Sequence, residues 1–291
     1  MTPPEPTNCG SAPGSDRQIA NRAPAGRMVA ALIALGMTTR APMPPRSAMP
    51  PYQTFTIDSR AVAERRTINV YTPPEYSAHP TAGFPVLYMP DGGVAEDFPH
   101  VVTTIDSLIR LERIPPLLVV GIENTERRRD MTGPTTVGTD SAIARRVGGS
   151  AAFRGFIRDE LMPEVRKRYH TTEETSIVGE SLAGLFVVET FLLEPTVFRR
   201  YIALSPSLWW NHGALLQSLD RRLDAQTGLH RTIYLTAATE PGIGAETASL
   251  AAALEARAPA DLTWFYEPRP DLAHGTIFLG VAPGAFAKVL K

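Results

Sequence analysis

The chain has 291 residues, with 29 lysines and arginines against 30 aspartates and glutamates, which gives a net charge of −1. Hydrophobic residues make up 43% of it and charged residues 20%, an ordinary globular composition that excludes a disordered, highly charged chain. The near-zero net charge argues against a nucleic-acid binder that works through bulk positive charge. No apolar run approaches the roughly 18–20 residues that span a bilayer, so a polytopic membrane protein is excluded and no transmembrane span is expected.

The sequence offers little support for a disulfide or a metal site. Cys9 is the single cysteine, so neither an intramolecular disulfide nor a cysteine-based metal site can form. The six histidines lack the short paired spacing of a zinc site. We therefore expect neither a metal nor a cofactor.

Residues 1–51 differ in composition from the rest of the chain and are predicted to be a proline-rich flexible leader. Ten of the 27 prolines precede Tyr52, a density that breaks helices and removes strand donors. An apolar run at 28–37 follows three arginines and has the length of a signal-peptide core, but no clear cleavage site follows it. Export, a short leader helix and a misplaced start codon are all left open, with a cytoplasmic location slightly favoured over export.

From Tyr52 onward the hydrophobic pattern is regular, and strands alternate with helices. In chain order we predict strands at 54–57, 67–71 and 85–89, a helix at 100–111, a strand at 117–122, a helix at 153–169, a strand at 176–179, a helix at 182–193, a strand at 201–204, a helix near 214–219, a strand at 232–237, a helix at 247–256, a strand at 262–266 and a final helix at 281–290.

This alternation predicts the fold class. Short apolar runs such as 85–89 and 117–122 are typical of buried parallel strands. Helices between such strands make right-handed crossovers, so we expect an α/β fold with a mostly parallel central sheet and helices on both faces. The chain has no internal repeat and no second composition regime after the leader, which indicates one domain over residues 52–291.

The sharpest local motif is Gly179-Glu-Ser-Leu-Ala-Gly184, which lies between a predicted strand and a predicted helix. Small residues on both sides of Ser181 permit a tight strand-to-helix turn that exposes the hydroxyl group, the layout of a nucleophile elbow. Ala183 stands where the second glycine of that motif usually occurs. The alternative is a serine that only caps a helix, but the strand before it and the helix after it favour the nucleophile.

A nucleophilic serine needs a base, and in this fold class the chain order is serine, acid, histidine. His274 follows the last predicted strand, in a loop at the same sheet edge as Ser181. His230 precedes the strand at 232–237 and therefore lies at the opposite edge. We predict that His274 is the base.

The acid is expected after the strand at 232–237, where Glu240 has the right order and the right sheet edge. Its role would be to accept the second imidazole N–H and stabilise the imidazolium. Glu246 is the nearest alternative and Asp271 a more remote one. A solvated turn carboxylate is the alternative explanation of Glu240.

Two backbone N–H groups are needed to stabilise a tetrahedral oxyanion. Leu182, directly after the serine, provides the first. The second is expected in the loop after the strand at 85–89, where Gly93 is the preferred donor and Gly92 the second choice. An Asp-Gly-Gly sequence is also simply a common turn.

Together these segments resemble the putative-esterase (esterase D-like) family of α/β-hydrolases. The resemblance covers residues 54–290 and rests on Arg65–Pro73, Pro85–Gly93, Gly179–Gly184, the run Ser205-Pro-Ser-Leu-Trp-Trp210 and His274-Gly275. That tryptophan run is most similar to the siderophore (enterochelin-type) esterase branch. The resemblance implies an α/β-hydrolase fold, Ser181 as nucleophile, His274 as base and Gly93 as second oxyanion donor. It also implies that the site can be a Ser–His dyad, which leaves Glu240 open.

The resemblance extends to a possible substrate cleft. The arginine segment 127–130 resembles one near the family's cleft, so Arg128 and Arg129 are candidates for binding an anionic or catecholate acyl group. Trp209 and Trp210 are candidates for the wall of an aromatic pocket, although one of them is expected in the core. A solvated basic loop is the alternative reading of the arginines.

We therefore predict a serine esterase that hydrolyses carboxylic esters through an acyl-serine intermediate and acts on a small-molecule ester. The alternatives are an acyltransferase that uses an acceptor other than water, and a non-catalytic binding protein with the same fold. The sequence leaves the acyl group, the alcohol and the oligomeric state open.

Overall fold

The computed structural model describes residues 49–224 and 226–291. Residues 1–48, which contain Cys9, the apolar run at 28–37 and nearly all of the predicted leader, lie outside the described residues. No helix in the described part of the chain is long and apolar enough to cross a membrane.

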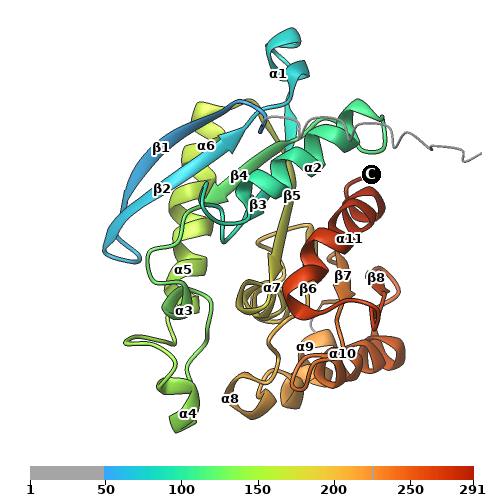
Figure 1. The fold of residues 1–291 in the computed structure, drawn as a ribbon. Helices are drawn as coiled ribbons and strands as arrows, with labels where there is room; N and C mark the ends of the chain where they lie inside the picture. Colours follow the sequence, from blue (N-terminus) through green and yellow to red (C-terminus); the bar gives the residue numbers. More distant parts are fainter. Residues whose placement is uncertain (1–48, 225) are drawn as a thin grey trace, which may run out of the picture. The chain divides into compact units, whose positions relative to one another are not determined.

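A single eight-stranded sheet forms the centre of the described residues (Figure 1). Its spatial order is β1-β2-β4-β3-β5-β6-β7-β8. Strand β2 pairs antiparallel with β1 and with β4, and all the other neighbouring strands are parallel. The strands are β1 Tyr52–Ser59, β2 Glu64–Tyr71, β3 Phe84–Met89, β4 Leu118–Ile122, β5 Thr171–Glu180, β6 Arg200–Leu204, β7 Thr232–Thr236 and β8 Thr263–Tyr266.

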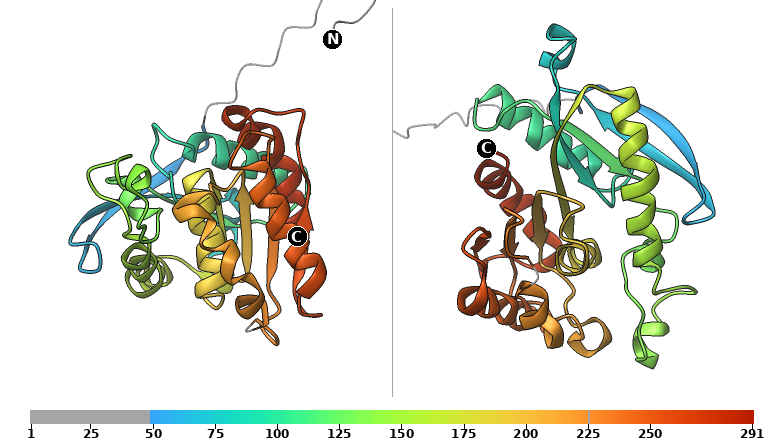
Figure 2. Two further views of the ribbon diagram at one scale, coloured as in Figure 1. Left: turned by 90° about the horizontal axis from the view of Figure 1, so that it is seen from below. Right: turned by 180° about the vertical axis from the view of Figure 1, so that it is seen from behind.

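Helices cover both faces of the sheet, as the three views in Figures 1 and 2 show. Helices α2 and α11 pack on one face, whereas α5, α6, α7, α9 and α10 pack on the other, and each face has its own buried apolar cluster. The helices are α1 Pro74–Ala78, α2 Phe98–Arg110, α3 Arg127–Asp130, α4 Gly138–Ser141, α5 Ser150–Phe156, α6 Met162–Arg168, α7 Leu182–Leu193, α8 Trp210–Gly213, α9 Leu219–Asp224, α10 Gly244–Arg257 and α11 His274–Val289.

Two predicted helices are divided into shorter segments in the structure. The helix expected at 153–169 starts at Ser150 and is interrupted by a π-helical segment, Ile157–Leu161, between α5 and α6. Pro163 is the second residue after this segment and has no N–H for an i→i−4 bond, which favours the wider turn. The helix expected near 214–219 is replaced by α8, a 3₁₀ turn at Leu216–Ser218 and α9.

The last helix begins seven residues earlier than predicted, at His274 instead of residue 281. Gly275, Gly280 and Pro283 weaken the local helical signal. The observed helix is sustained by packing, because Ile277, Phe278 and residues of the following turns are buried on the sheet. The predicted base is therefore the first residue of a helix and not part of a loop.

The arrangement of the parallel strands determines where candidate site residues meet. The carboxyl ends of β3, β4, β5, β7 and β8 all open onto one edge of the sheet, since these strands run in the same direction. In open α/β sheets, sites lie at that edge.

Candidate active site

Ser181 occupies a strained turn between β5 and α7. Its backbone has φ 60° and ψ −120°, a conformation that a non-glycine residue rarely adopts. Gly179 makes the turn possible, because a Cβ at this position would lie 2.5 Å from the carbonyl group of Ala183. The backbone thus passes close to itself and directs the serine hydroxyl away from the end of the strand.

The Ser181 hydroxyl contacts the imidazole of His274. The Ser181 Oγ to His274 Nε2 distance is 2.9 Å, although 93 residues separate the two along the chain. Burial lowers the pKa of His274 below its usual value of 6.5, Glu240 opposes this shift and Arg127 adds to it. The ring is therefore neutral at neutral pH, and with its proton on Nδ1 it offers the Nε2 lone pair to the serine O–H.

Glu240 binds the backbone of His274 rather than its ring. Its Oε1 accepts the His274 backbone N–H, and this hydrogen bond holds the pKa of the carboxyl below its usual value. His274 Nδ1 and Glu240 Oε2 are both buried and have no hydrogen-bond partner among the described residues. The hydrogen bond predicted from the imidazole to Glu240 is not formed in the structure, whereas the carboxylate does lie beside the base.

The two alternative acids are placed differently. Asp271 is exposed and forms an ion pair with Arg269, with 2.6 Å between Arg269 Nη2 and Asp271 Oδ2. Glu246 lies in the first turn of α10 and forms no hydrogen bond or ion pair with His274. Neither carboxylate contacts the base in the structure, and Glu240 is the better candidate of the three.

We expect Glu240→Gln to lower kcat/KM roughly ten- to a hundredfold. Glutamine keeps an acceptor for the His274 N–H but removes the negative charge that favours the imidazolium. Steady-state kinetics on a chromogenic ester measure this effect. Glu240→Ala is the matched variant and should lose more, since it also frees the first turn of α11. Full activity in Glu240→Gln would show that Glu240 only positions the first turn of α11.

The two backbone N–H groups predicted to bind the oxyanion differ in whether they already donate a hydrogen bond. Leu182 N–H is the first of α7 and belongs to the N–H groups that a helix leaves without internal partners. Gly93 N–H donates to Glu96 Oε2 at 2.7 Å, and Gly92 N–H donates to the carbonyl of Ile122 at 2.9 Å. Gly92 is thus occupied within the backbone, and Gly93 is available only when the Glu96 side chain moves.

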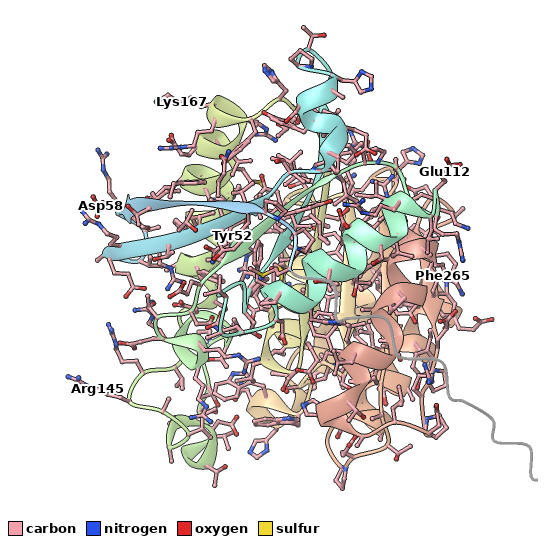
Figure 3. All side chains as sticks on the ribbon, turned by 45° about the horizontal axis from the view of Figure 1, so that its top comes forward. Tyr52, Asp58, Glu112, Arg145, Lys167 and Phe265 are labelled. Atoms are coloured by element: carbon pink, nitrogen blue, oxygen red, sulfur yellow. The ribbon has the colours of Figure 1, made fainter. Side chains whose placement is uncertain are left out.

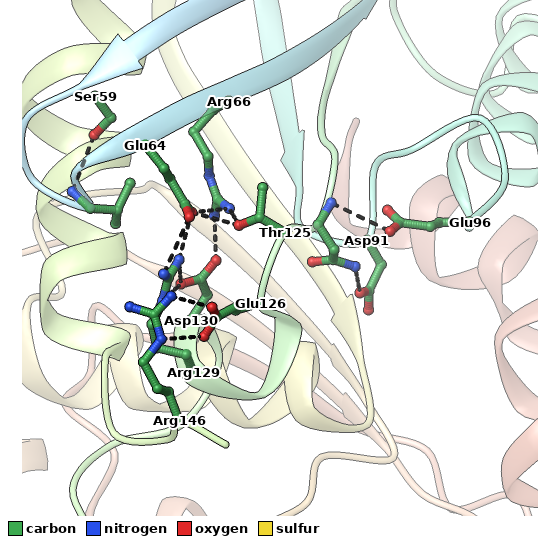
Figure 4. Close-up of polar contacts among 12 residues, drawn as sticks. Ser59, Glu64, Arg66, Asp91, Glu96, Thr125, Glu126, Arg129, Asp130 and Arg146 are labelled. Carbon is green, nitrogen blue, oxygen red and sulfur yellow. Dashed lines mark hydrogen bonds and ion pairs between the residues drawn. The ribbon is translucent and has the colours of Figure 1, made fainter. Parts of the chain in front are cut away.

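An ion pair with α3 holds the loop after β3, which carries the predicted oxyanion donors Gly92 and Gly93. Asp91 has φ 56° and directly precedes the two glycines. Its carboxylate accepts two hydrogen bonds from Arg127, with Nε···Oδ1 2.6 Å and Nη2···Oδ2 2.8 Å, and one from Asn124 Nδ2 at 2.5 Å. Figure 4 shows the side chains of Asp91 and Glu96 close together, and both accept a hydrogen bond from Asn124. The ion pair therefore fixes the loop in a conformation that is otherwise unfavourable.

The structure revises which arginine of the segment 127–130 lies beside Ser181. Arg127 Nη2 lies 3.5 Å from the carbonyl oxygen of Glu180, next to Ser181. Arg129 is buried, and its guanidinium pairs with Glu64 at 2.6 Å and with Asp130 at 2.6 Å (Figure 4). This ionic cluster is not free to bind a substrate, so Arg127 replaces Arg129 as a candidate. Arg128 is exposed and donates to the carbonyl of Ile143.

The two tryptophans have separate roles. Trp210 is buried and donates its indole N–H to the carbonyl of Gly133 at 2.8 Å, so it belongs to the core. Trp209 is half-buried and packs against Gly242, in the loop that also carries Glu240. Because Trp209 lies beside the loop that carries Glu240, its role as an aromatic pocket wall stays a prediction.

Three residues near the reacting atoms were not among the predicted site residues. Ser207 Oγ lies 3.4 Å from Ser181 Oγ, and Glu180 Oε1 lies 3.2 Å from His274 Nε2. Arg127 is the third. The signal for Glu180 was its place directly before the serine. No group of three or more possible metal ligands occurs among residues 49–224 and 226–291.

Comparison with known proteins gives relatives with named activities. Ferri-bacillibactin esterase BesA of Bacillus subtilis is 32% identical over 180 residues, which are 54% of this chain and 59% of the relative. Apo-salmochelin esterase of Escherichia coli O6:H1 is 28% identical over 165 residues, 52% of this chain and 50% of the relative. The chain thus spans about half to three-fifths of the length of these curated relatives.

Solved structures share the fold. An IroE-like serine hydrolase from Shewanella oneidensis superimposes with a TM-score of 0.73 at 24% identity and covers 82% of this chain and 79% of its own. The enterobactin esterase FES of Shigella flexneri gives 0.64 at 21% identity, over 82% of this chain and 58% of its own. The predicted α/β-hydrolase fold is confirmed.

A family model described as Putative esterase matches residues 59–262, which include β2 through α10 and the nucleophile elbow. This match covers well over half of the chain and agrees with the fold and with the resemblance of the sequence motifs. The chain belongs to the putative esterase family.

Proposed function

We propose that the chain hydrolyses carboxylic esters through an acyl-serine intermediate. The observation that carries this proposal is the 2.9 Å contact between Ser181 Oγ, on a strained elbow, and His274 Nε2. A serine held against a neutral imidazole at a helix N-terminus is the arrangement that acyl transfer requires. The family and the named activities of the relatives support the same reaction.

In this mechanism, Ser181 Oγ attacks the ester carbonyl carbon while His274 Nε2 takes its proton. The negative charge on the carbonyl oxygen is stabilised by the N–H of Leu182, and by that of Gly93 once Glu96 has released it. The C–O bond to the alcohol then breaks, and Nε2–H protonates the leaving oxygen. Water enters and loses a proton to the same nitrogen while its oxygen attacks the acyl carbon. The bond from that carbon to Oγ then breaks, and Nε2–H returns the proton to Ser181 Oγ, which restores the serine.

We infer that the acyl or alcohol part of the substrate carries negative charge, as the siderophores named for the relatives suggest. A cavity of about 450 Å³ lies beside α3, whose Arg127 is 3.5 Å from the carbonyl oxygen of Glu180. It is lined by one acid, Glu126, and by Arg127, Arg128, Arg129, Ala144, Arg145 and Arg146. Arg146 pairs with Glu126, whereas Arg128 and Arg145 have no ion-pair partner in the described part of the chain. Figure 3 shows that the Arg145 side chain points away from the body of the molecule.

A panel of esters tests both the reaction and this preference. We expect wild type to hydrolyse short neutral p-nitrophenyl esters and, more efficiently, catecholate esters with negative charge. Arg128→Ala/Arg145→Ala should raise KM for the charged esters about tenfold, because two charge-assisted hydrogen bonds are lost at exposed positions. Turnover of the neutral ester should stay the same and is the internal control.

Two results would contradict the proposal. If no ester in the panel is hydrolysed, the reaction is wrong. If the double variant affects neutral and charged esters equally, the reaction stands, and the charge preference is wrong. Product analysis in the presence of alcohols shows whether water or another acceptor takes the acyl group.

A further inference from the structure

Glu180 contacts the base at the same nitrogen that the nucleophile uses. It is the last residue of β5 and directly precedes Ser181. Its Oε1 lies 3.2 Å from His274 Nε2, and its side chain is only 17% exposed. Oε1 is buried and makes no aligned hydrogen bond within the described residues. The mechanism above assigns nothing to this carboxyl group.

Charged groups from several elements surround Glu180. They are Arg127 on α3, Asp91 in the loop after β3, Asp97 before α2, Glu240 after β7 and the His274 imidazole. Burial raises the pKa of Glu180 to about 8, the carboxylates of Asp97, Asp91 and Glu240 add to this shift, and Arg127 opposes it. At neutral pH, the carboxyl group is therefore mostly protonated.

A protonated carboxyl group at this position competes with the nucleophile. The neutral imidazole has one lone pair at Nε2, which can accept one hydrogen bond. Ser181 O–H must occupy that lone pair to be deprotonated. A protonated Glu180 carboxyl group lies within hydrogen-bond reach of the same lone pair, because its Oε1 is 3.2 Å from Nε2.

An ionised carboxylate has the opposite effect. When the serine proton moves to Nε2, the imidazolium N–H faces Glu180 Oε1 at hydrogen-bond distance. The negative charge stabilises this imidazolium in a partly buried site where Nδ1 has no hydrogen-bond partner among residues 49–224 and 226–291. The proton stays on Nε2 and passes from there to the leaving oxygen, so Glu180 gains and loses no proton during turnover.

Resting on the proposed esterase reaction, we propose that Glu180 is a positioning residue that acts through His274: it blocks Nε2 while it is protonated and supports the base once it is ionised. Activity therefore depends on the ionisation of Glu180 as well as on that of His274. Because Glu180 and His274 interact, they titrate as a coupled pair, and the deprotonation with the higher apparent pKa limits the reaction.

The pH profile of kcat/KM tests this proposal. In wild type we expect an acid limb near pH 8, below which the rate falls roughly tenfold per pH unit. Glu180→Ala removes the carboxyl group that competes for Nε2. The rate of this variant should therefore fall only below the pKa of His274, which is lower than 6.5. At pH 9, the variant should be about tenfold slower than wild type, since one pKa unit of imidazolium stabilisation is lost. At pH 6.5 it should be as fast as wild type or faster, so that the two profiles cross.

Two variants separate this role from a structural one. Glu180→Asp keeps a titratable group and should restore an acid limb above pH 6.5. Asp97→Asn removes a neighbouring half-buried carboxylate that does not touch Nε2. It should shift the pH at which the wild-type rate falls slightly downward without abolishing the fall. Parallel profiles for wild type and Glu180→Ala would overturn the proposal.

The rate of serine labelling by a fluorophosphonate, measured over the same pH range, makes the test independent of the ester. If the serine is labelled and the limb is identical in wild type and Glu180→Ala, only the role of Glu180 is wrong. If wild type is neither labelled nor active on any ester, the proposed function fails, and the role of Glu180 fails with it.

Discussion

Replacing Ser181 with alanine should lower kcat on a p-nitrophenyl ester by roughly 10⁴-fold or more and abolish fluorophosphonate labelling. The variant retains the elbow, but it has no atom that can form the acyl bond, so only the oxyanion donors and binding contribute to any remaining rate. Because Ser181 is half-buried and its side chain makes no bond that supports the fold apart from the contacts to His274 and Ser207, the far-UV spectrum should be unchanged.

Ser207→Ala is the matched control for this experiment. Its hydroxyl lies in the same site, 3.4 Å from Ser181 Oγ, but no base contacts it. We expect a loss of at most about tenfold, because one neutral hydrogen bond is removed. A Ser181→Ala protein that keeps wild-type turnover, or an equal loss in the two variants, would exclude Ser181 as the nucleophile.

Replacing His274 with alanine should cost a similar factor, since serine alone is a poor nucleophile at neutral pH. Residues that act as one unit do not lose activity additively, so Ser181→Ala/His274→Ala should be no slower than either single variant. Added imidazole should restore part of the activity of His274→Ala, because the deleted ring leaves space beside Ser181 Oγ. Initial rates against imidazole concentration measure this rescue.

His230→Ala is the control for the base. His230 is exposed and precedes β7, at the sheet edge opposite to Ser181, so its removal should leave kcat/KM unchanged. Imidazole should not accelerate Ser181→Ala, which lacks the atom that attacks. Wild-type activity in His274→Ala without imidazole would show that another group deprotonates the serine.

Much of the fold follows from local pattern. Buried parallel strands such as β3 and β4 are short continuous apolar runs, and their spacing by helical segments is readable without tertiary information. Each of the eight strands overlaps a predicted one, with bounds that differ by a few residues. The start of α11 was missed because glycines and a proline conceal a helix that packing stabilises.

The approach of Ser181 to His274 was predictable for a similar reason. Both residues follow strands of one parallel sheet, so chain direction alone brings them to the same edge. The identity of the contacting arginine was not predictable. Consecutive residues of a helix point about 100° apart. On the single turn of α3, Arg127 therefore faces Asp91 in the loop after β3, Arg128 faces the Ile143 carbonyl, and Arg129 faces the half-buried Glu64.

The sequence by itself determined the sheet, the elbow and the edge at which the serine and the histidine lie, because each of these depends on residue size, apolar periodicity and chain direction. Only the tertiary structure decided the partners of the polar groups. Glu96 occupies the N–H of Gly93, Glu240 binds the backbone of the base, and Glu180 shares Nε2 with the nucleophile. Several carboxylates lie within reach of each donor at this edge, and packing selects among them through differences in distance that no sequence pattern encodes.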